Sequence, residues 1–435
     1  MATTSPIPTP PDPLSMRDVL AIPIMRRLWY AQIISTFGDF LALFAVISVL
    51  TFNLRATPQQ VTGLQIAYLL PIAILGILAG VFVDRWPLKP TLIASDLTRA
   101  ALVLLLLFGH GLWNFYIVLA SISVVSSFFS PAQGVAIRAA VPMHGLRSSN
   151  ALMQQAIFGI RIIGPALAAF LVATLGPRSC YLADSASFIA SACLIATLAI
   201  RRPEIAPPIP ATADGPNAGS PATPEKRSAL ASILPDMRVG ISFILHHGGL
   251  LFVILALTAG MFVIGCFGPL IAIYVRDSLH ASTRSFGIIS AMIGIGMFLG
   301  INLLNTLGKK LANTTLVYSG LTGIAIGLAG LTLLTHIWSA IAANLIIGAA
   351  VGCIIVPATT LMQQETPPAL IGRVGSTMMS VIFGAQIAGL VLSGLLADRI
   401  GVRNVFAACA ILLILLTAAG KLLLHPKPSP PPATP

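Results

Sequence analysis

This chain of 435 residues contains twelve separate runs of predominantly apolar residues. A helix needs about 20 apolar residues to cross the hydrocarbon core of a bilayer, so each run predicts one membrane-spanning helix. The chain is 56% hydrophobic and only 9% charged, and it could not cover its own surface in water. The expected spans are residues 28–52, 62–84, 91–109, 114–137, 150–174, 179–200, 249–274, 285–307, 313–334, 338–361, 374–397 and 402–424.

One long polar segment divides the twelve spans into two sets of six. Its first part is rich in Pro, Ala and Gly, which favours a flexible or extended linker. The part after Lys226 can form an amphipathic helix along the membrane surface. The expected organisation is an N-terminal tail (1–27), a six-helix bundle (28–200), the linker (201–247), a second six-helix bundle (248–424) and a C-terminal tail (425–435).

The basic residues predict how the chain crosses the membrane. If the N-terminus is cytoplasmic, most of the 25 Lys and Arg residues fall in cytoplasmic segments, among them Arg26, Arg27, Lys309 and Lys310. This distribution satisfies the positive-inside rule, so both termini and the linker are expected in the cytoplasm. The same distribution accounts for the net charge of +12 without nucleic acid, since no basic run alternates with exposed aromatic residues.

Glycine and proline positions of the first half recur in the second half. At an offset of 225 residues, Gly176 corresponds to Gly401, whereas Arg161 corresponds to Gln386. The chain is therefore expected to be an all-α membrane protein of two pseudo-symmetric six-helix bundles. Parallel repeats of this kind place a substrate site near the midplane, between the halves. Because the second half lacks the arginine, the fold does not require a charge at position 161.

Three charged residues inside the expected spans, Asp39, Arg99 and Arg161, are candidates for proton or ion coupling. A carboxylate in hydrocarbon is costly, so Asp39 should face a cavity or a partner. Arg161 lies at a similar depth and is the expected partner of Asp39. Asp96 is the expected partner of Arg99, because residues three apart share one face of a helix. Asp39 could therefore carry a proton or belong to a permanent structural ion pair, and both interpretations stay open.

Two further motifs predict movement. Gly164-Pro165 removes a backbone donor from the fifth span and permits a hinge there. An acid and two bases lie at the cytoplasmic end of the second span. They can form a network that locks one conformation, or they can belong to a loop that is merely solvated. This expected cytoplasmic gate consists of Gly80, Asp84, Arg85 and Lys89.

The duplicated layout of six plus six spans resembles the major facilitator superfamily. The gate residues are similar to that family's signature between helices two and three, with Pro87 and Leu88 where a glycine and a basic residue are usual. Gly164-Pro165 resembles the family's antiporter motif in helix five. The segment from Gly394 to Arg403 matches the signature more literally, but the helix count places it in an external turn.

Other phrases look like the branch that holds enterobactin exporters and macrolide efflux proteins. They include Ser130-Pro-Ala, Arg161-Ile-Ile-Gly-Pro165, Asp184-Ser-Ala-Ser-Phe188 and Tyr274-Val-Arg-Asp277. This resemblance implies a monomeric transporter in a bacterial cytoplasmic (inner) membrane, surrounded by membrane lipids. It would export an amphipathic small molecule (a drug, a macrolide or a siderophore) by alternating access and proton antiport. In the family architecture, helices one, four, seven and ten face the centre, which nominates as cavity-lining residues Ser35, Asp39, Ser123, Ser127, Thr258, Met261 and Asn344. Gln386 on helix eleven is another polar candidate.

Other functional classes are compatible with twelve membrane spans. A lysophospholipid flippase on the same scaffold is the main alternative, followed by a non-transporting membrane sensor. A membrane enzyme lacks a nucleophile or an acid/base constellation, and a channel lacks a charged ring or a filter-like repeat. The sequence contains no G-x-x-x-x-G-K-[ST], no H-E-x-x-H and no C-x-x-C motif, so we expect no ATP, no metal and no other cofactor.

Overall fold

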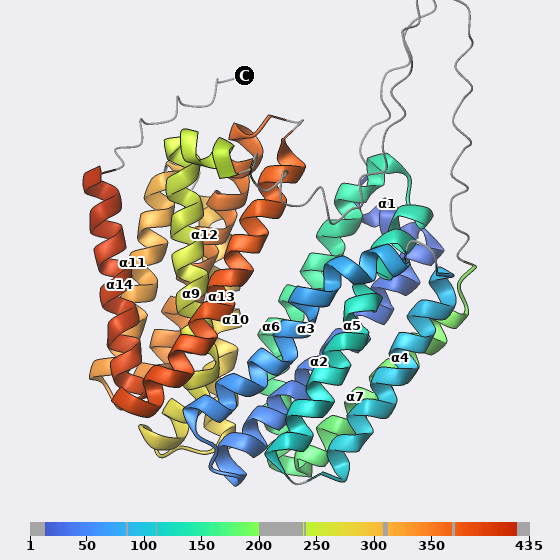
Figure 1. The fold of residues 1–435 in the computed structure, drawn as a ribbon, viewed down its shortest axis with the longest axis horizontal. Helices are drawn as coiled ribbons and strands as arrows, with labels where there is room; N and C mark the ends of the chain where they lie inside the picture. The colour runs from blue at the N-terminus through green and yellow to red at the C-terminus, as the bar shows by residue number, and fades with distance from the viewer. Residues whose placement is uncertain are drawn as a thin grey trace, which may run out of the picture.

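The computed structural model describes residues 14–83, 86–109, 111–199, 238, 241–307, 312–367 and 370–423. These residues form helices and no strand (Figure 1), which confirms the all-α prediction. Within the described part, eleven helices are long and apolar enough to cross a membrane, or twelve if the two arms of one bent helix count as one span. The expected C-terminal tail, residues 1–13 of the expected N-terminal tail and most of the expected linker lie outside the described residues. Residues 16–21 and 23–27 of the expected N-terminal tail are helical, as are residues 241–246 of the expected linker.

The first bundle begins with a short helix, α1 (Met16–Ala21), whose first turn is capped by Ser15 and Asp18. Helix α2 (Pro23–Ser48) continues into a π-helical turn, η1 (Val49–Asn53). The other elements of this bundle are α3 (Pro58–Val83), α4 (Leu88–Leu104) with the 3₁₀ turn η2 (Leu105–Leu107), α5 (Leu112–Ala140), the 3₁₀ turn η3 (Met143–Gly145), α6 (Leu146–Leu175) and α7 (Pro177–Ala196).

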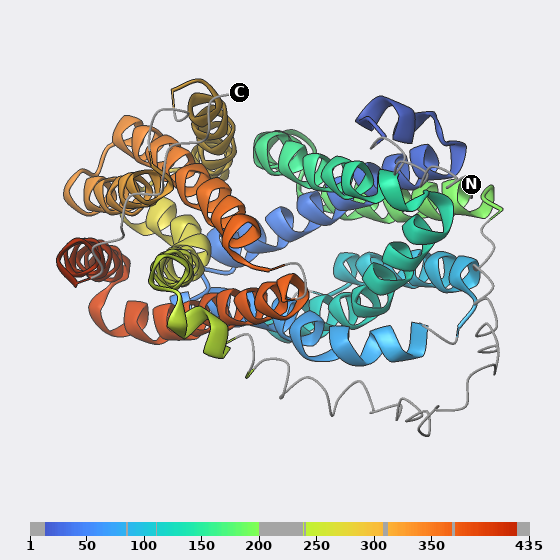
Figure 2. The ribbon, with the colours of Figure 1, turned by 90° about the horizontal axis from the view of Figure 1, so that it is seen from above.

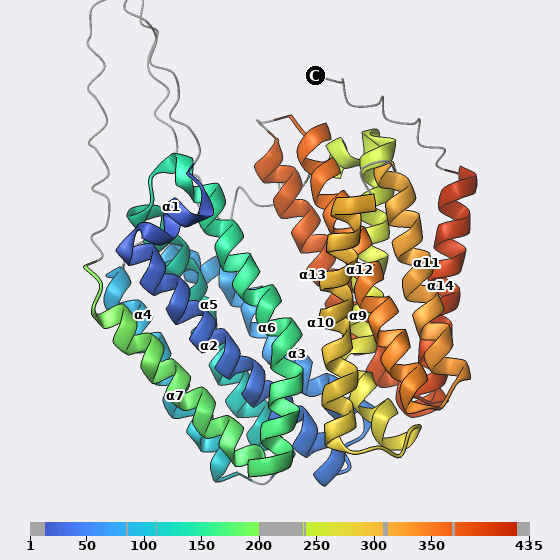
Figure 3. The same ribbon diagram turned by 180° about the vertical axis from the view of Figure 1, so that it is seen from behind.

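The second bundle repeats this order and lies beside the first (Figures 2 and 3). Its helices are α9 (Gly248–Asp277), α10 (Thr283–Leu307), α11 (Asn313–Leu333), α12 (Ile337–Glu365), α13 (Ile371–Ile400) and α14 (Val402–Leu423). In both bundles the helices are apolar over most of their surface, because lipid as well as neighbouring helices must be contacted.

The repeat predicted from the glycines is visible in the backbone. Helices α6 and α13 are both 30 residues long, and they end at Gly176 and Gly401 with φ of +80° and +82°. A side chain is strained at such an angle, so both halves need glycine at this turn. The turn after α13 lies on the face opposite the two termini, which is where the helix count placed the segment from Gly394 to Arg403 (Figure 1).

The two bundles meet through two equivalent pairs of helices, α6 with α10 and α3 with α13. Both contacts depend on glycines that admit the neighbouring helix. A Cβ atom on Gly287 would meet the Pro165 carbonyl oxygen at 3.0 Å and also the Ala169 methyl group. A Cβ atom on Gly394 would meet the Thr62 side chain. The bundles converge at the end away from the termini, as Figure 1 shows.

Candidate substrate cavity and buried charge cluster

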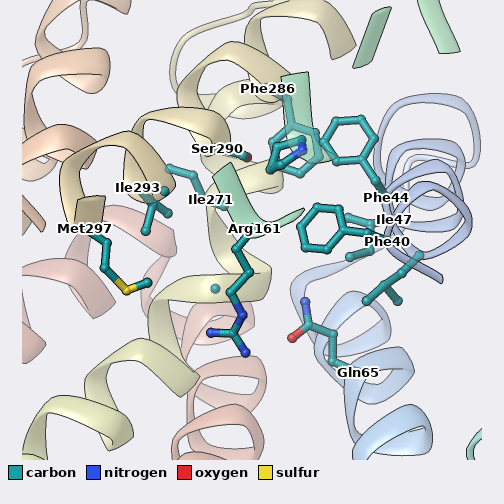
Figure 4. Close-up of a pocket in the computed structure, with 14 residues that line it drawn as sticks. Phe40, Phe44, Ile47, Gln65, Arg161, Ile271, Phe286, Ser290, Ile293 and Met297 are labelled. Carbon is teal, nitrogen blue, oxygen red and sulfur yellow. The ribbon is translucent and has the colours of Figure 1, made fainter. Parts of the chain in front are cut away.

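A cavity of about 350 Å³ lies between the two bundles (Figure 4). Helices α2, α3 and α6 supply one wall, and α9 and α10 supply the other. Most lining side chains are aromatic or aliphatic, and the polar ones are Gln65, Arg161 and Ser290. A largely apolar concavity with a few polar groups, of a few hundred Å³, is typical of a small-molecule site.

Aromatic stacking closes the cavity toward the face away from the termini. Phe44 of α2 stacks on Phe286 of α10, with ring centroids 4.7 Å apart and planes inclined by 13°. Both rings line the cavity. Beyond them, the Ser48 hydroxyl donates to the Thr283 hydroxyl at 3.2 Å, which joins the two bundles again.

An arginine latch reinforces this closed face. Arg276, at the end of α9, donates from Nη1 to the carbonyl oxygens of Thr51 and Ala56, each at 2.9 Å. Its Nε and Nη2 atoms donate to both oxygens of Asp277, at 2.6 and 2.7 Å. The guanidinium therefore joins the end of α9, the first long helix of the second bundle, to η1 and to the loop that follows η1. Arg276 belongs to the sequence phrase Tyr274-Val-Arg-Asp277, which by itself indicates no role for the arginine.

Arg161 projects into the cavity from α6 and is exposed there (Figure 4). No carboxylate of the described residues lies within ion-pair distance of it. The predicted pairing with Asp39 is therefore wrong. The reason is rotational: Phe40 lines the cavity, whereas Asp39, the preceding residue, lies on the side of α2 that approaches α4. Consecutive residues in a helix point about 100° apart, so equal depth does not bring two side chains together.

Arg99 is the cation that Asp39 approaches, with 3.9 Å between Nη1 and the carboxylate oxygen. The predicted ion pair of Arg99 with Asp96 is confirmed. The guanidinium lies between the rings of Phe129 and Phe188, 4.4 and 4.3 Å from their centroids. Such cation–π contacts are strongest where water is excluded.

A third carboxylate, Asp184 of α7, completes the charge cluster, which we define as Asp39, Asp96, Asp184 and Arg99. Asp184 and Asp96 are 1% and 0% exposed, and both Asp39 and Arg99 act electrostatically on Asp184. Ser191 donates to Asp96 at 2.7 Å. Asp184 was not among the predicted site residues, although it is a carboxylate inside an expected span, as Asp39 is.

The charge cluster holds more acids than bases. The cluster as defined contains three carboxyl groups and one guanidinium, of which Asp39 and Asp96 lie within ion-pair distance of Arg99, so it is electrically neutral only when two of the carboxyl groups carry protons. An uncompensated buried charge is costly, and protonation is the usual way to remove it. The side chain of Asp39 is 25% exposed, in contrast to Asp96 and Asp184, so Asp39 is the most accessible carboxyl group of the cluster.

The residues predicted to line a cavity lie elsewhere. Ser123 donates to the Tyr68 carbonyl oxygen, and Ser127 donates to the Pro71 carbonyl oxygen at 3.4 Å, so both hydroxyls of α5 contact α3. Asn344 is fully buried and donates to its own helix at 2.8 Å. None of the predicted residues lines the cavity between the bundles, namely Ser35, Asp39, Ser123, Ser127, Thr258, Met261, Asn344 and Gln386. A serine hydroxyl that donates to a helix carbonyl packs well in apolar surroundings, which explains why Ser123 and Ser127 are buried between helices.

The described residues include the whole predicted hinge but only part of the predicted gate. Helix α6 bends by 41° between Met143–Arg161 and Ile163–Leu175. The ring of Pro165 opposes the carbonyl four residues earlier, that of Arg161, so a bend one turn before the proline has a direct cause. Asp84 and Arg85 of the expected gate lie outside the described residues, while Gly80 belongs to α3 and Lys89 to α4.

Comparisons with known proteins agree with this architecture. The family model for the Major Facilitator Superfamily matches residues 28–390. An uncharacterized MFS-type transporter of Bacillus subtilis, YfiS, is 29% identical over 91% of this chain and 93% of its own length. Macrolide efflux protein A of Streptococcus pyogenes is 25% identical over 89% of this chain and 92% of its own length. The crystal structure of a point mutant of the nucleoside transporter NupG superposes with a TM-score of 0.67 at 12% identity, over 92% of this chain and 99% of that one. At that identity the likeness concerns the fold alone.

Proposed function

The chain belongs to the major facilitator superfamily, and we propose that it exports an amphipathic small molecule by alternating access in exchange for protons. It is a multi-pass membrane transporter and not an enzyme. The drug-like class of the substrate is supported by the apolar and aromatic walls of the cavity, and by a relative that bears the name macrolide efflux protein.

Proton coupling rests on one observation: the cavity and the charge cluster share helix α2. Phe40 lines the cavity, and its neighbour Asp39 belongs to the cluster. A change in the charge of Asp39 alters its attraction to Arg99, and with it the position of the helix that carries Phe40 and Phe44. A substrate that presses on these two rings acts on the same helix. Proton binding and substrate binding therefore both act on the position of α2. Coupling requires such an element, whose conformational equilibrium both sites shift.

The positive-inside distribution supports a direction for the transport cycle. With both termini in the cytoplasm, the closed face with Arg276 is external and the cavity opens inward. A transporter in this state can load a substrate from the cytoplasm of a bacterial cell. Opening of the external face requires the Arg276 latch and the Phe44–Phe286 stack to separate.

The experiment is transport of an amphipathic anionic fluorophore, dansyl-glycine, into inverted membrane vesicles under an imposed pH gradient. Asp39→Asn should abolish the part of the flux that depends on the gradient, a loss of roughly tenfold or more, since a neutral amide cannot exchange a proton. Substrate exchange without a gradient should persist, because the cavity is intact. Asp398→Asn is the matched control, an exposed aspartate at the end of α13. Full gradient-driven flux in Asp39→Asn would falsify the assignment of Asp39 as the proton carrier.

A further inference from the structure

The central cavity contains a positive charge, that of Arg161, which no acid of the described residues neutralises. Arg161 is its charged lining residue, and Gln65 and Ser290 are its other polar ones. The Ser290 hydroxyl is buried and has no hydrogen-bond partner among the described residues. The cavity thus presents a guanidinium and unengaged donor groups, while the part of its wall that the structure describes includes no acid.

The fold provides no internal reason for this arginine. Asp39 and Asp96, two acids of the charge cluster, both lie within ion-pair distance of Arg99 instead. The repeat has Gln386 at the corresponding position of α13, and α13 packs on α9 as α6 packs on α2. A cation at mid-depth in a membrane is costly, and it commonly marks a site for a ligand or a counter-ion. The missing partner is therefore expected to come from outside the protein.

We propose that Arg161 binds an anionic group of the transported molecule, so that the substrates are amphipathic oxyanions. A guanidinium binds a carboxylate, sulfonate or phosphate through two parallel hydrogen bonds. The rings of Phe40, Phe44 and Phe286 line the same cavity and accept an aromatic or branched apolar body (Figure 4). This inference rests on the proposed function, since it specifies the substrate class of the proposed exporter. It predicts that net positive molecules are bound poorly.

The test uses three dansyl probes that share one ring system and differ in one charge: dansyl-glycine (anionic), dansyl-glycinamide (neutral) and dansyl-ethylenediamine (cationic). Binding to the purified full-length protein in lipid nanodiscs is followed by fluorescence. The wild type should bind the anion roughly tenfold to hundredfold more tightly than the amide, as expected for a charge-assisted contact. The cation should bind most weakly.

Two variants assign the effect to Arg161. Arg161→Gln should bind the anion and the amide with equal affinity, because it retains a polar side chain but no charge. The second half carries glutamine at this position, so the fold tolerates it. Arg161→Lys keeps the charge and should retain preference for the anion, reduced because an ammonium lacks the planar pair of donors. Arg178→Gln, an exposed arginine near the start of α7, is the control and should behave as the wild type.

Three outcomes would overturn the proposal: equal affinity of the wild type for the anion and the amide, a preserved anion preference in Arg161→Gln, or transport of a macrolide by a wild type that binds none of the probes. These outcomes are separable from a failure of the coupling mechanism. Charge selectivity is read at equilibrium without a gradient, whereas the role of Asp39 is read from gradient-driven flux. Either result can be negative while the other is positive.

Discussion

Replacement of Arg276 by glutamine should loosen the closed face of the transporter. The guanidinium donates to the carbonyl oxygens of Thr51 and Ala56, and its side chain is only 11% exposed. Glutamine is shorter and uncharged, so it cannot reach both oxygens and also pair with Asp277. The change removes contacts that exist only while the two bundles touch, and it leaves the interior of each bundle unaltered.

The size of the effect follows from the two lost hydrogen bonds. A hydrogen bond from a charged donor contributes about 1.5–3 kcal/mol, and the freed carbonyls at the rim regain part of this from water. We take about 2 kcal/mol for the pair, which raises the population of the open state roughly 30-fold. The Phe44–Phe286 stack and the α6–α10 and α3–α13 contacts remain, so the closed state still dominates.

The assay is cysteine labelling from outside the cell. In a chain whose five cysteines have been replaced, Ser48→Cys places a thiol at a position that is 1% exposed beneath the latch. A membrane-impermeant maleimide reaches it only when the bundles separate there. Addition of Arg276→Gln should raise the labelling rate roughly 30-fold, in proportion to the open population. Arg284→Gln, an exposed arginine at the start of α10, serves as the control and should leave the rate unchanged.

A rise of less than about threefold would refute the argument, since it would leave under 1 kcal/mol for the whole latch. Equal acceleration by Arg284→Gln would refute it in another way. The effect would then come from the net charge of the external face, and not from the two hydrogen bonds of Arg276.

Three further substitutions test the charge cluster and the packing. Arg99→Gln should destabilise the purified protein by about 3–5 kcal/mol at neutral pH, because it leaves Asp96 and its neighbours without a cation. The loss should shrink toward acidic pH, where protonated carboxyl groups need no positive partner; a pH-independent difference in thermal midpoint would contradict this reasoning. Gly287→Leu should hold α10 away from Pro165 and Ala169 and accelerate labelling at position 48, whereas Gly268→Leu fills the cavity and should slow transport without that acceleration. Labelling that is unchanged in Gly287→Leu would show that this contact does not control closure.

The number, length and duplication of the spanning helices were accessible from the sequence because the bilayer imposes them. A backbone in hydrocarbon must satisfy its own hydrogen bonds, and about 20 apolar residues are needed to cross. The prediction for the first span, residues 28–52, therefore corresponds to α2 and its π-helical extension. The glycine that ends α6 and the one that ends α13 were readable for the same kind of reason, since a positive φ tolerates few other residues.

The direction in which each helix faces was decided only by the tertiary structure. In a soluble protein an apolar stripe marks the buried face, but a membrane helix is apolar toward lipid and toward its neighbours alike, so its rotation leaves little trace in the sequence. Depth along the helix was predictable for Asp39 and for Arg161, and depth alone suggested that they pair. Packing of α2 between α6 and α7 instead turns Asp39 toward Arg99 and leaves Arg161 in the cavity. A difference of one residue, between Asp39 and Phe40, separates the buried charges from the proposed substrate site.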